Sequence, residues 1–475
     1  MRNIVKSCVL AFMLVFSNCW SSQLMAQTEN LACKAVAEQY EKKYNAGDAE
    51  GVFAMFNGDM QSALPLEKTK ETLNILNAMF GKIKSRTFIR NKDATNVYQV
   101  ECEKDVATLV ISIDANSKIN GLLMNPFKKK TEDKNAVNAL TDISKEQAKI
   151  IFDKAKSFPN KTQLSIAFIE NEKVRYYGVI KENDSLKTID NKESVFEIGS
   201  ISKVFTSTLL ANAVLEKKVK LDDDISKFYD FPFKNNAKID FKSLSNHTSG
   251  LPRMPTNFEG ANPDNPYKDY DETKLNFYLK NELAQSQTTR EKSEYSNLGA
   301  GLLGFTLGKL QKSSYEKLLN DKIFEKYKMT SSFVSSKQVK SRLVKGLDES
   351  GKEVANWDLN VLVSAGGILS NVTDLSKFVN AQFQASNKEL ALTRNPTFTV
   401  NEKLKMGLAW HIRKTKMGKD IYGHNGGTGG YSSSMAINME NKNSMIILSN
   451  VSGLSSNNGN IIQICWELLE SLEKK

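Results

Sequence analysis

Cysteine is scarce in this sequence, and the few cysteines lie far apart. Five occur in 475 residues, and three of them follow residue 26: Cys33, Cys102 and Cys465. Three cysteines are too few for a disulfide scaffold, and no Cys-x-x-Cys pair suits a zinc site. One Cys33–Cys102 bridge would suit an oxidising compartment, and two ordinary buried thiols fit the sequence equally well. No metal and no organic cofactor is implied.

Long apolar runs are also missing, apart from one near the N-terminus. Cys8–Phe16 is apolar, follows two basic residues and precedes Ala26, a small residue at a candidate cleavage point. The run is shorter than the ~20 residues that a membrane-spanning helix needs. We therefore predict a signal peptide over residues 1–26 and a protein that is periplasmic or secreted, with no transmembrane segment after signal removal. An uncleaved anchor is one alternative, and a lipoprotein form through Cys19 is another, although the residues before Cys19 match such a signal poorly.

Acidic residues are outnumbered by basic ones. The 54 Asp and Glu face 65 Lys and Arg, which gives a formal net charge of +11. Such an excess can bind nucleic acid or anionic surfaces. Here the lysines are spread along the whole chain, and their densest run is Lys128–Lys130. We interpret them as solvated surface, and we expect a small-molecule or peptide substrate and no nucleic acid; the oligomeric state stays unknown.

The first part of the chain has the pattern of an α+β domain, predicted over residues 27–127. Helical periodicity over Leu31–Tyr44 ends at residues 45–48, and further helices are predicted near residues 52–56 and over Leu73–Ile83. Strands are predicted after these helices, at Val97–Val100, Ala107–Asp114 and Ile119–Met124.

A charged stretch, residues 128–145, is predicted to be a linker, and residues 146–475 a second domain. This domain begins with a predicted hairpin, Leu164–Glu170 and Val174–Val179. Two strands, Ser434–Ile437 and Ser444–Leu448, and a helix near residues 461–472 lie at its other end. Because strands from both ends would share one sheet, we expect a single α/β unit in which an antiparallel sheet is flanked by helices and joined to a helical region.

The first candidate for chemistry is Ser200, which opens a predicted buried helix, with Lys203 one turn later on the same face. A serine hydroxyl needs a base to become a nucleophile, and a lysine in a dry pocket can have a lowered pKa and serve as that base. The same spacing occurs at Ser314–Lys317 and Ser471–Lys474, where a helix cap followed by a surface lysine is the better interpretation. At Ser200 the apolar flanks favour catalysis.

The second candidate is the pair Tyr295 and Asn297, which precedes a glycine-rich apolar helix. A nearby lysine cation would favour the tyrosine phenolate and make Tyr295 a usable base. Asn297 offers both a donor and an acceptor for a lysine or a substrate amide. The alternative is that Ser296 or Asn297 only caps the helix.

The third candidate is the stretch Tyr422–Ser434, YGHNGGTGGYSSS, which contains His424, Gly426 and Gly427. Glycine of this density weakens a strand, so it needs a reason. An acyl-transfer site needs backbone N–H groups aimed at the developing oxyanion. We expect Gly427 to provide one such donor and the glycines to let substrate approach the backbone; the alternative is a remote glycine-rich turn.

Ser-x-x-Lys, Tyr-x-Asn and His-x-Gly, in this order, resemble the motifs of the serine β-lactamase and penicillin-binding-protein fold. Within it, the class C β-lactamase / D-alanyl-D-alanine carboxypeptidase family is the best match, also through SNHTSGLP at residues 245–252 and SAGGILSNVTDLSKFV at residues 364–379. The resemblance implies a serine hydrolase that forms an acyl-enzyme on an amide or ester, with peptidase, esterase or β-lactamase-like activity. It implies Ser200 as nucleophile, Lys203 and Tyr295 in proton transfer, and a substrate contact from Asn297, with His424 and Gly426 as the third motif. A penicillin- or peptidoglycan-binding sensor that acylates without efficient turnover is the alternative.

One departure from the family pattern concerns the third motif, where many class C β-lactamases have Lys-Thr-Gly and this chain has His424-Asn425-Gly426. Histidine is largely neutral at pH 7, so it suits a substrate carboxylate less than lysine does. His247 is expected to have a structural role in its turn, and His411 has no partner that the sequence identifies. In the first domain, YNAGDAEGVFAMF followed by VATLVISIDANSKINGLLMNPF resembles the cone-shaped nuclear-transport-factor-2-like fold.

Overall fold

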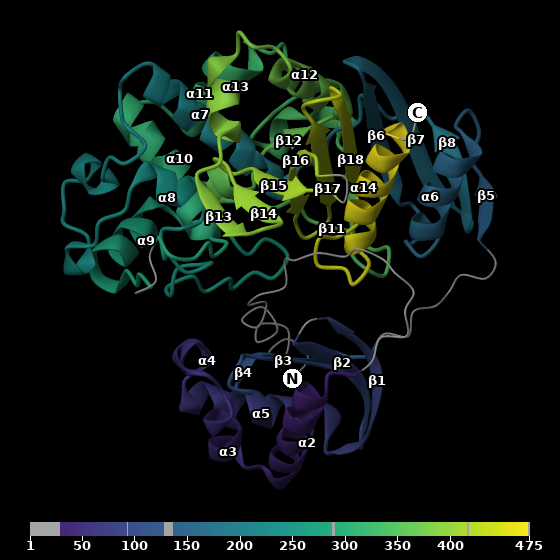
Figure 1. Ribbon diagram of the computed structural model, residues 1–475, viewed down its shortest axis with the longest axis vertical. Coiled ribbons are helices and arrows are strands. Elements are labelled where there is room, and N and C mark those ends of the chain that lie inside the picture. The colour runs from purple at the N-terminus through teal and green to yellow at the C-terminus, as the bar shows by residue number, and fades with distance from the viewer. Residues whose placement is uncertain (1–28, 93, 128–135, 287–289, 416–417, 474–475) are drawn as a thin grey trace. The chain divides into compact units, whose positions relative to one another are not determined.

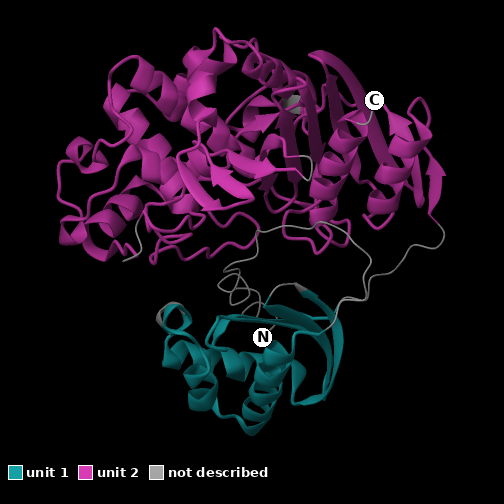
Figure 2. Ribbon diagram, viewed as in Figure 1, with its two compact units in different colours: residues 1–131 teal, residues 132–475 magenta. Residues whose placement is uncertain are grey.

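The computed structural model describes residues 29–92, 94–127, 136–286, 290–415 and 418–473. The chain forms two compact units, residues 1–131 and residues 132–475 (Figure 2). The predicted signal peptide and Cys19 lie outside the described residues. Among the residues that are described, no helix has the length and apolarity needed to cross a membrane.

Unit 1 packs helices against one face of a four-stranded antiparallel sheet of order β1-β2-β3-β4 (Figure 1). Along β2 and β3, alternate side chains are buried beneath the helices, as expected for a sheet with one covered face. Its elements are α2 (Leu31–Ala46), α3 (Ala49–Ala54), α4 (Gly58–Ala63), α5 (Leu66–Phe80), β1 (Ile83–Lys92), β2 (Thr95–Cys102), β3 (Val106–Ile113) and β4 (Ile119–Pro126). The α+β pattern predicted for this region is therefore observed, whereas the resemblance to the nuclear-transport-factor-2-like fold stays a prediction.

Two details of unit 1 differ from the predictions. The helix predicted to reach Ile83 ends at Phe80, because Gly81 adopts a left-handed φ of 71° and β1 begins at Ile83. Strand β1 was not predicted, since its sequence IKSRTFIRNK mixes charged and apolar residues without a period of two. The Cys33–Cys102 bridge is not formed: both are free, buried thiols, and Cys33 Sγ donates a hydrogen bond to the Ile111 carbonyl at 3.1 Å.

Unit 2 is built on a ten-stranded sheet of order β13-β14-β15-β16-β17-β18-β6-β7-β8-β5. All neighbours are antiparallel except β5 and β8, which are parallel. Its strands are β5 (Val137–Ala139), β6 (Gln163–Glu170), β7 (Lys173–Glu182), β8 (Ser185–Ile189), β13 (Phe398–Asn401), β14 (Leu404–Met406), β15 (His411–Lys414), β16 (Asp420–Gly427), β17 (Ser432–Asn438) and β18 (Asn443–Ser449). As predicted, β6 and β7 from the start of the unit share one sheet with β17 and β18 from its end.

The linker predicted over residues 128–145 is wrong at its C-terminal side. Val137–Ala139 form the edge strand β5, and Lys145 begins helix α6. Strand β5 is only three residues long and exposed throughout, so it carries no burial pattern that a sequence could reveal. Residues 128–135 lie outside the described chain.

Two apolar cores lie on opposite faces of this sheet. Met445 and Ile447 of β18 face one core, which α6 and α14 cover, while Ile446 and Leu448 face the other (Figure 1). Burial on both faces explains why β18 is continuously apolar rather than alternating. The helices are α6 (Lys145–Ala155), α7 (Ser202–Leu215), α8 (Phe241–Ser245), α9 (Glu272–Phe277), α10 (Asn297–Gln311), α11 (Tyr315–Leu319), α12 (Val372–Gln382), α13 (Lys388–Arg394) and α14 (Gly459–Glu473).

Two further pairs of short strands complete unit 2, and one of them leads into the candidate site. They are β9 (Phe196–Glu197) with β12 (Leu369–Ser370), and β10 (Gly346–Leu347) with β11 (Glu353–Val354). The β9–β12 pair fixes the chain immediately before Ser200.

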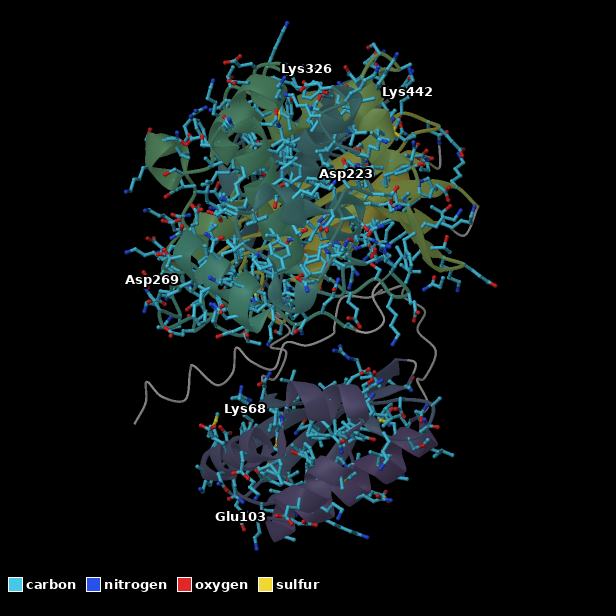
Figure 3. The ribbon with its side chains drawn as sticks, turned by 90° about the vertical axis from the view of Figure 1, so that its left-hand side faces the viewer. Lys68, Glu103, Asp223, Asp269, Lys326 and Lys442 are labelled. Carbon is cyan, nitrogen blue, oxygen red and sulfur yellow. The ribbon has the colours of Figure 1, made fainter. Side chains whose placement is uncertain are left out.

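Charged side chains are distributed over the periphery of each unit (Figure 3). The lysines are interspersed with carboxylates: Lys326 pairs with Glu389, and Lys442 pairs with Glu172. This mixture fits the interpretation of the lysines as solvated surface.

Candidate active site

Ser200 lies in a tight turn between β9 and helix α7. Gly199 makes this turn possible with a left-handed φ of 51°, and residues Gly199–Ile201 form one turn of 3-10 helix before α7 begins at Ser202. Ser200 is therefore placed one turn ahead of the α-helix rather than at its first residue. Its side chain is half-buried, whereas Lys203, on the first turn of α7, is only 2% exposed.

Lys203 Nζ contacts three oxygen atoms. It lies 2.9 Å from Asn297 Oδ1, 2.6 Å from the Ala365 carbonyl oxygen and 3.1 Å from Ser200 Oγ. Burial, reinforced by the positive charge of Arg253, lowers the pKa of Lys203 well below its ordinary value. The ammonium form would donate to all three oxygens, whereas a neutral amine donates to the two carbonyl oxygens and keeps one lone pair for the Ser200 hydroxyl proton. This geometry therefore suits Lys203 as the base that activates Ser200.

Tyr295 completes the contacts of the Ser200 hydroxyl. Its Oη donates a hydrogen bond to Ser200 Oγ at 2.6 Å, and Lys203 Nζ lies 4.7 Å from the centroid of its ring. The prediction that a lysine cation would favour the phenolate is wrong: burial raises the pKa of Tyr295 to about 12, against smaller opposite effects from Ser200 and Arg253. Tyr295 is therefore a phenol that can give a proton rather than take one.

Asn297 is the first residue of α10, and it reaches back into the site. Its Oδ1 accepts from Lys203, and its Nδ2 donates to Tyr267 Oη at 3.4 Å. The capping role belongs to its neighbour, since Ser296 Oγ accepts a hydrogen bond from Gly299 N at 2.8 Å. Both interpretations of this motif thus apply, each to a different residue.

Strand β16 brings a backbone amide to the same place. Thr428 N donates to the Tyr431 carbonyl at 2.9 Å, so these two residues form a hydrogen-bonded pair. Hydrogen-bonded and non-hydrogen-bonded pairs alternate along an antiparallel ladder, and the neighbouring pair is Gly427 with Ser432. The Gly427 N–H therefore points away from β17. This nitrogen lies directly against Gly199, because a β-carbon built on Gly199 would stand 2.5 Å from it. The amides of Ser200 and Gly427 are therefore neighbours, as a pair of oxyanion donors must be.

The reason predicted for Gly426 is not the one that the structure gives. A β-carbon on Gly426 would lie 2.0 Å from the Ile198 carbonyl oxygen and 2.4 Å from Ser433 Oγ, rather than in an open approach path. Ser433 Oγ also donates to that carbonyl at 2.8 Å. Gly426 is thus glycine so that β16 can pack against the backbone that carries Ser200.

The chain has three histidines, and contacts link each of them to the site: His247 packs on Tyr295, His424 belongs to β16, and His411 packs on His424. The His424 Nδ1 lies 2.8 Å from the Asn425 carbonyl oxygen, and its ring packs edge-on against that of His411, with centroids 5.1 Å apart. Burial holds the pKa of His424 well below its usual range, and burial with the nearby Arg413 charge lowers the pKa of His411 to about 4. Both rings are therefore neutral at pH 7.

His247 supports Tyr295 from behind. Its Nδ1 accepts a hydrogen bond from Ser296 N at 3.2 Å, and its ring centroid is 4.6 Å from that of Tyr295. It adopts a left-handed φ of 64° in the turn after α8. Burial lowers the pKa of His247 well below its usual range, so it is neutral and structural, as expected from its turn.

The serines of the two other Ser-x-x-Lys spacings have ordinary structural roles, and Lys474 lies outside the described residues. Ser314 Oγ accepts from Lys317 N at 3.2 Å as a helix cap, and Lys317 pairs with Asp321 on the surface. Ser471 Oγ donates to the Leu468 carbonyl within α14. Within the described ranges, no group of three His, Cys, Asp or Glu side chains is arranged to hold a metal ion.

Sequence reasoning missed three participants. The Ala365 carbonyl that binds Lys203 has no side-chain signal, although it lies inside the quoted stretch at residues 364–379. Tyr267 and the exposed Arg253 lie in or next to loops without periodicity, and their contacts with Asn297 and Tyr295 arise only in the folded chain.

Comparisons with known proteins agree with this architecture. The family model described as Beta-lactamase matches residues 160–463, and a family described as a protein of unknown function, DUF3887, matches residues 37–122. A Beta-lactamase from Pseudomonas fluorescens is 29% identical over 259 residues, which are 52% of this chain and 69% of that protein. Beta-lactamase-like protein 2 from Dictyostelium discoideum is 32% identical over 177 residues, 35% of this chain and 31% of that protein.

Solved structures share the fold of unit 2. A class C beta lactamase from Rhodobacter sphaeroides is matched over 70% of this chain and 100% of its own, with a TM-score of 0.57 and 16% identity. An octameric penicillin-binding protein homologue from Pyrococcus abyssi is matched over 70% of this chain and 78% of its own, with a TM-score of 0.56 and 24% identity. Since the family model covers more than half of the chain, this protein belongs to the beta-lactamase family, with the serine β-lactamase and penicillin-binding-protein-like fold.

Proposed function

We propose that unit 2 is an exported serine hydrolase of the class C β-lactamase / D,D-peptidase type, which forms an acyl-enzyme on an amide or ester through Ser200. The observation that carries this proposal is the position of one hydroxyl: Ser200 Oγ lies 3.1 Å from Lys203 Nζ and 2.6 Å from Tyr295 Oη. A base and an acid both contact the same serine, as nucleophilic catalysis requires.

Acylation follows from these contacts. The Lys203 lone pair takes the Ser200 proton while Oγ bonds to the substrate carbonyl carbon. The carbonyl oxygen becomes an oxyanion that accepts from the Ser200 and Gly427 amides. As the bond to the leaving atom breaks, Tyr295 gives that atom its proton and recovers one from the protonated Lys203. Water then attacks the acyl-enzyme, and the same groups act in reverse to release the acid and restore Ser200.

Because His424 is neutral, the third motif suits acyl donors that place no carboxylate beside it. Open-chain amides and esters are therefore preferred over β-lactams. Asn297 would bind a substrate amide through Nδ2 when it is not engaged with Tyr267. Fast deacylation distinguishes this enzyme from a sensor that stays acylated, and the release of acid from a chromogenic ester over many turnovers measures it.

The experiment that tests the proposal is labelling with a fluorophosphonate and a fluorescent penicillin, followed by mass spectrometric mapping. We expect the label on Ser200, and we expect Ser200→Ala to lose both label and hydrolysis while its circular dichroism is unchanged. Ser314→Ala is the matched control, because Ser314 has the same spacing to a lysine, and it should keep full labelling. Label on Ser314, or hydrolysis that survives in Ser200→Ala, would disprove the assignment.

A further inference from the structure

Glu197 is a buried carboxyl group at the end of β9, three residues before Ser200. The residue is 5% exposed, and burial raises the pKa of its carboxyl group. Among the described residues, the groups that oppose this rise are hydrogen-bond donors such as Asn356 and Trp357, and none of them is a cation. Burying a carboxyl group without a cation costs free energy, so the contacts of Glu197 need a reason.

One carboxyl oxygen of Glu197 holds two neighbouring residues of a loop. Its Oε1 accepts hydrogen bonds from Asn356 Nδ2 at 2.7 Å and from the backbone N of Trp357 at 3.0 Å. Asn356 Nδ2 also donates to Tyr431 Oη at 2.9 Å, and Tyr431 Oη donates to the Val344 carbonyl at 2.7 Å. Glu197 is therefore connected to Tyr431 through a single side chain.

These contacts meet at the turn of residues 428–431, which follows β16. Thr428 N donates to the Tyr431 carbonyl at 2.9 Å and closes the turn. Gly429 lies against the indole of Trp357, because a β-carbon built on Gly429 would stand 2.5 Å from Trp357 Nε1. The buried carboxyl group thus fixes this turn at two points, through the two loop residues that its Oε1 binds.

The turn follows directly on Gly427, the second oxyanion donor of the proposed mechanism. The Gly427 N–H points away from β17, so no ladder bond to that strand orients it, and glycine has no side chain that could pack. Its orientation depends on the turn on one side and on Gly199 on the other, where a β-carbon would stand 2.5 Å from Gly427 N. An oxyanion donor stabilises the transition state only if it is already aimed at the developing charge.

We propose that Glu197 is a positioning residue, which fixes the turn of residues 428–431 and thereby aims the Gly427 N–H at the oxyanion. It acts through other residues and not on the reacting atoms. This inference rests on the proposed function, since an oxyanion forms only if Ser200 attacks a carbonyl group.

The test compares two substrates that differ in the atom that becomes the anion: p-nitrophenyl benzoate and O-(p-nitrophenyl) thiobenzoate, in which sulfur replaces the carbonyl oxygen. Sulfur is the larger atom and the weaker acceptor, so the ratio of kcat/KM for ester over thionoester measures how well the oxyanion donors are aligned. The absorbance of p-nitrophenolate follows both reactions. Because losing one oxyanion donor costs ~10²–10³-fold and a displaced donor costs less, Glu197→Ala should lower the ratio by roughly 10- to 100-fold. The loss should lie in kcat rather than KM, because the oxyanion exists only beyond the ground state.

Two variants serve as controls. Glu197→Gln keeps a side-chain carbonyl that can accept the same two hydrogen bonds, so it should retain most of the ratio. Glu389→Ala is matched for the removal of a buried carboxyl group, because Glu389 is also 5% exposed but binds Lys326 and Tyr327 instead. It should leave the ratio unchanged even where it lowers the urea midpoint.

An unchanged ratio in Glu197→Ala would overturn the proposal, whether both esters keep their rates or lose them equally. A higher KM with an unchanged kcat would also overturn it, because Glu197 would then act on substrate binding. So would a loss in Glu197→Gln as large as that in Glu197→Ala, since the two hydrogen bonds would then not be what matters.

If Glu197→Ala does not fold by circular dichroism, Asn356→Ala carries the same test, because it removes only the bridge from Glu197 to Tyr431. It should lower the ratio in the same direction, and an unchanged ratio would overturn the inference. Fluorophosphonate labelling of Ser200 in the wild type tests the proposed function separately. A labelled, active wild type with an unchanged ratio in the variants means that this inference alone fails, so the two failures are distinguishable.

Discussion

The protonation state of Lys203 determines the mechanism, and replacing it with methionine makes that state measurable. In the folded protein, burial holds the pKa of Lys203 well below its ordinary value, while in the unfolded chain its pKa is ~10.4. Between these two values the unfolded state binds one proton more than the folded state. The free energy of unfolding therefore rises with pH across this window, by about 1.4 kcal/mol per pH unit from this one group.

Lys203→Met removes this contribution and keeps most of the buried volume. The loss of the hydrogen bonds to Asn297 and Ala365 costs a constant amount, because neither partner titrates. The difference in unfolding free energy between wild type and Lys203→Met should thus change by about 2 kcal/mol in favour of the wild type from pH 7.5 to pH 9.0. Other titrating groups are common to both proteins and cancel.

Tryptophan fluorescence during urea unfolding is a suitable assay. Trp357, Trp410 and Trp466 all lie in unit 2, and the fourth tryptophan, Trp20, lies within the predicted signal peptide. In a protein produced without residues 1–26, the signal therefore follows the unit that contains the candidate site. If the wild-type and Lys203→Met stability curves run parallel from pH 7.5 to pH 9.0, Lys203 is charged in the folded state, and the base mechanism derived from its three contacts fails.

Three further predictions concern the groups around Lys203. Tyr295→Phe should slow acylation in single-turnover assays by roughly 10²- to 10⁴-fold. The double variant with Lys203→Met should be little slower than either single variant, because the two residues act in one proton path. Fully additive losses in the double variant would contradict this. Gly426→Ala should lower the free energy of unfolding by about 1–3 kcal/mol or more, since its β-carbon would lie 2.0 Å from the Ile198 carbonyl oxygen. Gly427→Ala should lower it less, because the atom nearest to its β-carbon is 3.0 Å away. Equal urea midpoints for the two variants would count against the close approach at Gly426. His424→Lys should raise kcat/KM for a cephalosporin relative to a neutral ester, and an unchanged ratio would show that the third motif does not select for substrate charge.

The sequence predicted the side chains of the candidate site better than their environment. Ser200, Lys203, Tyr295 and Asn297 could be identified because each combines a reactive group with a flanking apolar helix, and the structure joins them by hydrogen bonds. The Ala365 carbonyl could not be predicted, because every residue has such a group and only the tertiary fold selects one.

The same limit applies to the sheet and to the glycines. Strand β18 was predictable because burial on both faces demands a continuous apolar run, here Met445–Leu448. Strands β1 and β5 were not, since their exposed or mixed residues carry no period. For Gly426 the sequence indicated that a β-carbon is excluded, but the excluding atom, the Ile198 carbonyl, lies more than 200 residues earlier in the chain.

One cause, burial, acts on both residues that we propose for proton transfer, in the direction that the proposed chemistry needs. A low dielectric disfavours the charged form of any group, so it lowers the pKa of Lys203 and raises the pKa of Tyr295 to about 12. The resting site then holds a neutral base and a neutral acid on either side of Ser200, with no ion pair between them to break before the reaction. A Lys203 cation and a Tyr295 phenolate would instead form such a pair. The apolar helix α7, which places Lys203 in the core, therefore sets the direction of proton transfer as well as the position of the residue.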